Sequence, residues 1–111
     1  MDQAQATPKA AAGEKETVLV DASFEPLMPQ FLTNRKRDVV TMRETLAQQD
    51  FETVQKVAHG MKGAGGSYGF DRITELAAGI EQAARAGDVS TIARDLSTLD
   101  SYLNRVKVVY E

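Results

Sequence analysis

Residues 59–69 read HGMKGAGGSYG and contain the only histidine of the chain together with five of its eight glycines. The segments on both sides carry the apolar periodicity of helices. Each glycine inside a helix costs ~1 kcal/mol relative to alanine, so four interior glycines would cost ~3–4 kcal/mol. Either the helix ends near Gly60, or the bare backbone around the imidazole has a purpose. The apolar phase continues unbroken through Met61 and Gly65, which favours a continuous helix and therefore the second explanation.

The direction of each side chain follows from placing a helix over residues 51–68. One face gathers the apolar positions and Gly65, and we expect it to face the core: Val54, Val57, Ala58, Met61 and Gly65. His59 lies roughly 150° from the centre of that face and should point to solvent. Gly63 and Gly66, four and seven residues after the histidine, should flank it on the exposed surface. Glycine at these positions removes side-chain bulk and lets another macromolecule approach the ring closely.

Two further helices are predicted downstream. Residues 70–84 place their apolar side chains on one stripe, and a second stripe extends over residues 89–110 with the spacing of a bundle helix. Gly69 should end the histidine-bearing helix in a left-handed conformation. Gly87-Asp88 is typical of a C-terminal glycine followed by an N-cap aspartate.

Upstream, residues 33–49 predict another helix, and Asp50 should cap the helix that carries the histidine. A short element over residues 24–32 contains Pro26 and Pro29, which suit a first turn or a kink. No segment alternates with a period of two for long enough to suggest a sheet. Because short connections make neighbouring helices antiparallel, we predict an all-α fold, an antiparallel up-down four-helix bundle with a short extra N-terminal helix.

The composition limits the remaining possibilities. With 111 residues the chain is large enough for one core, and we expect a disordered tail over residues 1–16 and the bundle domain over residues 17–111. A net charge of −3 argues against binding to nucleic acid, and the absence of cysteine excludes disulfides and thiol chemistry. No apolar run is long enough to cross a membrane and no signal-peptide pattern is present, so we expect a cytoplasmic protein.

The candidate chemistry depends on His59, because a neutral imidazole is a good nucleophile near neutral pH. The motif holds no second histidine, no cysteine and no acidic partner, so we expect an unpaired ring and no metal site. Lys62, three residues later, should fold back toward the imidazole and place an ammonium beside any group attached to it. Gln55 and Lys56, one turn before, could add hydrogen bonds or charge, although an ordinary solvated helix face is the plainer interpretation.

An exposed histidine with a neighbouring lysine and cleared backbone suits phosphoryl transfer, in which positioning and charge neutralisation do most of the work. A Ser-His-Asp arrangement with Ser67 would need an oxyanion pocket, which the amphipathic helices do not suggest. A small-molecule enzyme with His59 as general base would need a concave pocket beside the ring. A structural or adaptor bundle would make His59 an inert surface residue.

The residues match a known pattern. The stretch A-H-G-M-K-G at residues 58–63, followed by Gly69, Ile73, Leu76 and Ile80-Glu81, resembles the histidine-containing phosphotransfer (HPt) domain. The family pattern is His-x-x-Lys-Gly, a glycine ten residues after the histidine, and an amphipathic helix with a Leu-Glu pair. The resemblance covers roughly residues 20–110. Its departures are conservative, with Met61, Ile73 and Ile80 where leucine is commoner.

The resemblance implies a phosphorelay intermediate in two-component signal transduction. His59 would accept a phosphoryl group from a receiver-domain aspartate and pass it to another, and Lys62 would neutralise the phosphoryl oxygens. Gly63 and Gly66 would admit the receiver domain, with secondary contacts expected from Gln55, Lys56 and Tyr68, and from exposed residues of the preceding helix such as Arg35, Val40 and Arg43.

The resemblance also limits what the chain does by itself. The partner receiver, including that of a hybrid histidine kinase, would supply Mg²⁺, and this chain would bind no cofactor, nucleic acid or membrane. No phosphate-binding glycine loop followed by Lys-Ser/Thr is present, so the chain should be a phosphoryl carrier that does not use ATP by itself. It resembles a monomeric relay module rather than a dimerising kinase core.

Overall fold

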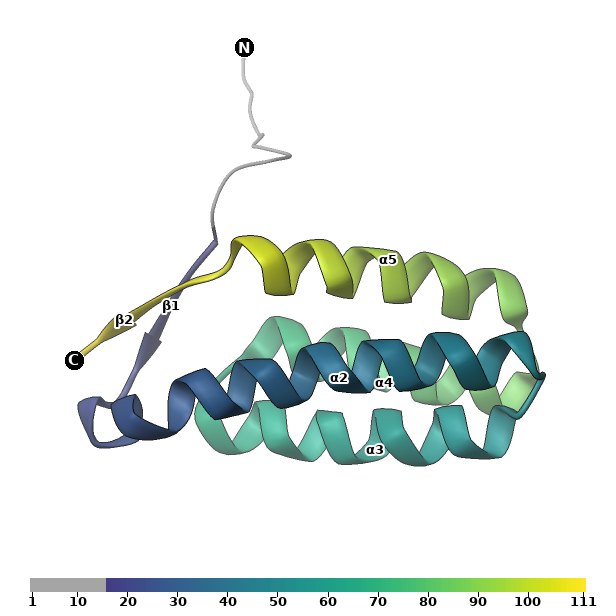
Figure 1. The fold of residues 1–111 in the computed structure, drawn as a ribbon, viewed down its shortest axis with the longest axis horizontal. Coiled ribbons are helices and arrows are strands. Elements are labelled where there is room, and N and C mark those ends of the chain that lie inside the picture. Colours follow the sequence, from purple (N-terminus) through teal and green to yellow (C-terminus); the bar gives the residue numbers. More distant parts are fainter. Residues whose placement is uncertain (1–15) are drawn as a thin grey trace, which may run out of the picture.

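The computed structural model describes residues 16–111. In this part of the chain the four long helices pack as an antiparallel bundle, in which α2 contacts α3 and α5, and α4 contacts α3 and α5 (Figure 1). The predicted four-helix bundle is confirmed. The elements in chain order are strand β1 (Thr17–Val20), 3-10 helix η2 (Ala22–Leu27), α2 (Met28–Ala47), α3 (Phe51–Tyr68), α4 (Asp71–Ala86), α5 (Val89–Arg105) and strand β2 (Lys107–Tyr110).

The helix ends follow the local sequence signals. Asp50 and Asp88 cap α3 and α5, and each carboxylate accepts a hydrogen bond from the backbone N–H three residues later. Gly69 and Gly87 end α3 and α4 with φ values of 81° and 66°, a left-handed conformation that glycine adopts without steric cost. These four predicted signals are confirmed, and they fix the short connections that turn each helix back along its neighbour.

The stripes predicted for residues 33–84 face the bundle core, although Leu46 and Val57 are only half-buried against it. The stripe of α4 is buried throughout, and Gly65 of α3 is buried against it. A Cβ added at Gly65 would lie 2.9 Å from Thr74 Oγ1 and 3.2 Å from the Thr74 backbone nitrogen, so the glycine permits the close approach of α3 and α4. Val89, the first residue of the last predicted stripe, is instead exposed at the beginning of α5.

Two short strands were not predicted. β1 pairs with β2 in parallel, from Thr17 opposite Lys107 to Val20 opposite Tyr110. The prediction that the chain contains no sheet is wrong for these residues, and α5 ends at Arg105 rather than continuing to residue 110. Four residues are too few for a recognisable alternation, and the pairing partners are far apart in the sequence.

The N-terminal boundary also differs from the expectation. η2 contains Pro26, whereas Pro29 lies in the first turn of α2, where a missing N–H costs no helical hydrogen bond. The separate element predicted over residues 24–32 is therefore wrong in its extent, because α2 already begins at Met28. Of the expected tail, residues 1–15 lie outside the described residues, and the carbonyl of Glu16 accepts a hydrogen bond from the Lys107 N–H. Among residues 16–111, no helix has both the length and the apolar composition needed to cross a bilayer.

Candidate functional site

His59 stands on the outer surface of an unbroken helix. α3 continues to Tyr68, so the four glycines after the histidine are helical. The imidazole side chain is 69% exposed, which confirms its predicted direction toward solvent. The ring is nevertheless not free, and the prediction that it is unpaired is wrong. Its Nδ1 lies 3.0 Å from Oε2 of Glu81, a residue of the adjacent helix α4.

Glu81 is the centre of the site. Its side chain is only 5% exposed, yet three donors surround it. Lys62 Nζ lies 2.8 Å from Oε1, whereas His59 Nδ1 and Arg85 Nη2 lie 3.0 and 3.1 Å from Oε2. The Lys62 hydrogen bond first, and the His59 contact after it, hold the pKa of Glu81 below its usual value despite the opposing effect of burial. A buried carboxylate needs such partners to remain charged.

The Glu81 contact fixes which ring nitrogen is available for reaction. An ionised carboxylate can only accept hydrogen bonds, so His59 Nδ1 must carry the proton that it donates to Glu81. In the neutral imidazole the lone pair then resides on Nε2. Glu81 therefore orients the ring through Nδ1 and leaves Nε2 unengaged.

The surface around the ring is largely bare backbone. A Cβ added at Gly60 or Gly63 would meet no atom within 4 Å, and one added at Gly66 would only reach Thr74 Oγ1 at 4.0 Å. In contrast to Gly65, packing within the described residues therefore gives no reason for the cost of these exposed glycines.

The sequence of the chain matches a known family. A family model described as the Hpt domain matches residues 26–108, from η2 into β2. The chain belongs to the Hpt domain family. It therefore has a role in histidine phosphotransfer within phosphorelays, and Hpt domains interact with response-regulator receiver domains. No curated protein and no solved structure gave a significant match to the chain.

The secondary residues predicted on α3 of this Hpt domain do not all lie beside His59. Gln55 is half-buried and Lys56 is exposed, one turn before the histidine, where Lys56 Nζ lies 3.4 Å from Glu52 Oε2. Tyr68 lies nine residues beyond the histidine, about 13 Å along the helix. Its ring packs edge-on against two aromatic rings at centroid distances of 4.9 Å, those of Phe24 and Phe31.

Of the three receiver-contact residues predicted on α2, two are exposed and one is not. Val40 is exposed, and Arg43 is exposed with its Nη1 3.6 Å from Asp100 Oδ2. Arg35 is not an exposed residue, because its side chain is only 15% accessible and its Nε donates to Asp38 Oδ2 at 2.9 Å. The expectation that Arg35 is an exposed residue of this helix is therefore wrong.

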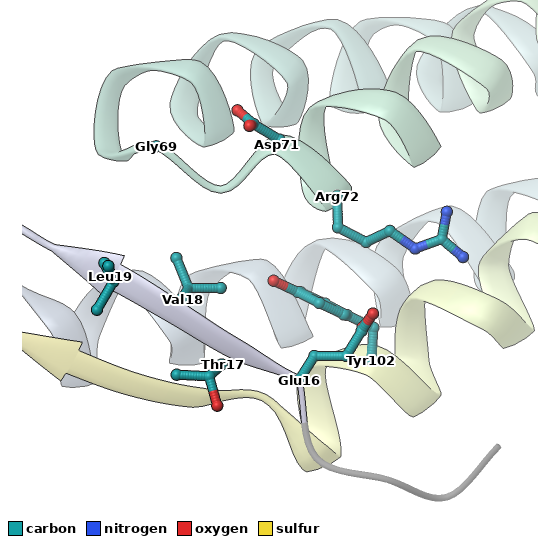
Figure 2. A pocket seen from close by; sticks show the side chains of 8 residues that line it. All are labelled: Glu16, Thr17, Val18, Leu19, Gly69, Asp71, Arg72 and Tyr102. Carbon is teal, nitrogen blue, oxygen red and sulfur yellow. The ribbon is translucent and has the colours of Figure 1, made fainter. Parts of the chain in front are cut away.

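Two cavities in the described part of the Hpt domain lie away from the histidine. One, of about 340 Å³, lies between β1, the turn from α3 to α4, and α5 (Figure 2). Burial raises the pKa of Tyr102, which lines it, to about 12, so this hydroxyl is no base near neutral pH. The other, of about 330 Å³, is lined by residues of η2, α2 and α3 that include Phe31 and Tyr68. His59 lines neither cavity, so neither supports the alternative of a small-molecule enzyme.

Sequence reasoning missed Glu81 and Arg85 as parts of the site. A signal was present, because Glu81 follows Ile80 within the apolar stripe of α4, next to Ala77 and Ala84. A carboxylate on a core-facing stripe requires partners from a neighbouring helix. Arg85, four residues later in α4 itself, lies on the same face and supplies a further partner.

Proposed function

We propose that this Hpt domain accepts a phosphoryl group from the aspartate of one receiver domain onto His59 Nε2 and passes it to the aspartate of another, acting as a monomer. The observation that carries the proposal is the contact between His59 Nδ1 and Glu81 Oε2 at 3.0 Å on an otherwise exposed ring. This contact orients the imidazole and leaves Nε2 as the nucleophile. The exposed glycines beside the ring give a second protein access to it.

The bonds and charges of this transfer balance without loss of a proton from the imidazole. The Nε2 lone pair attacks the phosphorus of the aspartyl phosphate, an N–P bond forms, the P–O bond breaks, and the aspartate leaves as a carboxylate. The ring keeps its Nδ1 proton and becomes positively charged, and Glu81 stabilises that charge across the existing hydrogen bond. The reverse sequence delivers the phosphoryl group to the next aspartate. The receiver would supply an acidic pocket that holds Mg²⁺, and the cation would neutralise charge on the phosphoryl oxygens.

The direct test uses receiver domains phosphorylated with acetyl phosphate. After mixing, the Hpt domain should carry label that is acid-labile and base-stable, located on the peptide that contains His59. The adaptor alternative, with an inert surface histidine, predicts binding without label. Absence of label with several receivers from the same organism would contradict the proposed relay role.

Lys62 is assigned to charge neutralisation of the transferred group. Lys62→Ala should slow transfer about fivefold without abolishing it, because a partly screened charge contributes about 1 kcal/mol or less. The measurement is the single-turnover rate of label transfer from a phosphorylated receiver. Lys36→Ala, which removes an exposed lysine from α2, is the matched control. A wild-type rate for Lys62→Ala would mean that its ammonium has no electrostatic role.

Glu81 is assigned to orienting the ring. Glu81→Gln should increase the fraction of His59 with its proton on Nε2, because an amide can donate to Nδ1 as well as accept from it. Heteronuclear NMR of the imidazole nitrogens measures this fraction directly, and the transfer rate should fall about tenfold, the size expected for loss of an orienting partner. Glu75→Gln, the same change at an exposed position of α4, is the control. An unchanged proton position would show that Glu81 does not set the tautomer.

A further inference from the structure

One oxygen of Glu81 serves two donors. His59 Nδ1 and Arg85 Nη2 both contact Oε2, at 3.0 and 3.1 Å, whereas Lys62 Nζ contacts Oε1 at 2.8 Å. Arg85 lies one turn after Glu81 on α4, so this ion pair lies within one rigid helix. Lys62 and His59 come from α3. The Glu81 carboxylate therefore contacts one cation from its own helix α4 and two side chains from α3, the helix that carries His59.

The proposed chemistry creates a conflict at this carboxylate. To neutralise a phosphoryl group on Nε2, the Lys62 ammonium must turn toward the phosphoryl oxygens and loosen its contact with Glu81. A buried carboxylate that loses its nearest cation is strongly destabilised. Glu81 would then either retain Lys62 or favour the Nδ1-protonated, positively charged ring more strongly. Both responses work against a stable phosphohistidine.

We infer that Arg85 is the positioning residue that resolves this conflict, because its guanidinium keeps Glu81 neutralised and in place while Lys62 turns to the phosphoryl group. The inference rests on the proposed function of His59. A guanidinium suits this role, since it stays charged at every working pH and presents several donors in a fixed plane. Arg85 acts through Glu81 and not on the reacting atoms.

Loss of Arg85 should therefore weaken the N–P bond in two ways. Without Arg85, Glu81 carries more uncompensated negative charge beside the ring, which favours the Nδ1-protonated, positively charged imidazole and makes Nε2 a better leaving group. Glu81 also holds Lys62 away from the phosphoryl oxygens. In the resulting hydrolysis, water attacks phosphorus, the electron pair of the N–P bond returns to Nε2, and inorganic phosphate is released.

The test measures the lifetime of the phosphohistidine in the full chain after chemical phosphorylation with phosphoramidate, so that no receiver is required. Arg85→Gln should shorten the half-life about threefold, the size expected of a half-exposed ion pair. Arg85→Lys should recover part of the loss. In a Lys62→Ala background the effect of Arg85→Gln should differ from that in the wild type, because the two residues act on one carboxylate and are therefore coupled; equal effects in the two backgrounds would contradict the shared role.

Arg94→Gln is the matched control. It removes the same charge from an exposed ion pair, that of Arg94 with Asp95 on α5, and should leave the half-life unchanged. Equal half-lives for wild type and Arg85→Gln would overturn the inference and leave the proposed function intact. A lower melting temperature with an unchanged half-life would assign Arg85 a structural role only and would also overturn it. Failure of wild-type His59 to take label from both phosphoramidate and phosphorylated receivers would overturn the proposed function itself.

Discussion

Replacing His59 with glutamine is expected to abolish phosphoryl acceptance and to leave the fold almost unchanged. Glutamine lacks a nucleophilic nitrogen, so no N–P bond can form. The side chain replaced is largely exposed, and Glu81 keeps Lys62 and Arg85 as partners. A surface substitution of this kind changes the free energy of unfolding by about 0.5 kcal/mol or less, which corresponds to about 2–4 °C in melting temperature.

Three measurements on the same variant make this prediction decisive. Label from a phosphorylated receiver should be absent, the circular dichroism spectrum should match that of the wild type, and the affinity for the receiver should be retained. Label on His59→Gln would identify a different acceptor residue. A fall in melting temperature well beyond a few degrees would mean that the ring contributes to packing, contrary to its exposure.

Two neighbouring glycines should respond to the same substitution in opposite ways. Gly65→Leu places a side chain where even a Cβ lies 2.9 Å from Thr74 Oγ1, so α3 and α4 must move apart. We expect a loss of about 2 kcal/mol or more in the free energy of unfolding. Gly63→Leu projects into open space, where leucine is a better helix former than glycine by about 0.8 kcal/mol. That variant should be at least as stable as the wild type.

Gly63→Leu, which should not destabilise the fold, should instead impair phosphoryl transfer. Gly63 lies one turn beyond His59 on the same face, so a leucine there adds bulk beside Nε2 and should slow transfer from a receiver by about tenfold or more. Gly63→Ala is the control for helix propensity, because it adds stability with much less bulk. Denaturant unfolding and single-turnover transfer separate the two quantities. A destabilised Gly63→Leu, or transfer at the wild-type rate, would contradict the docking role of this surface.

The parts of the fold that depend on local sequence could be predicted. The apolar spacing of the helices, the aspartate caps and the left-handed glycines all act within a few residues, and each is found where its signal lies. The β1–β2 pair could not be predicted in this way. Thr17 and Lys107 become neighbours only after the bundle brings the two ends of the domain together. The same tertiary effect converts residues 107–110 from an expected helix end into a strand.

In the candidate site, too, some features follow from local sequence and others depend on tertiary packing. The exposure of His59 and the burial of Gly65 follow from helical geometry, because both depend only on phase along α3. The partner of the imidazole comes from a different helix, 22 residues along the chain, and depends on how α3 and α4 pack. A helical wheel drawn for α3 alone cannot show Glu81. The predicted direction of the imidazole toward solvent is therefore confirmed, whereas the prediction that it has no partner is wrong.

The parallel pairing of β1 and β2 has a mechanical consequence. A domain joined ahead of Thr17 and another joined beyond Tyr110 would pull the two strands in opposite directions along their length. Such a load is shared by all the hydrogen bonds between the strands at once, instead of opening them one after another. The strand pair would then take up tension at the ends of the domain before it reached the helices, and the surface that presents His59 would keep its shape while tethered.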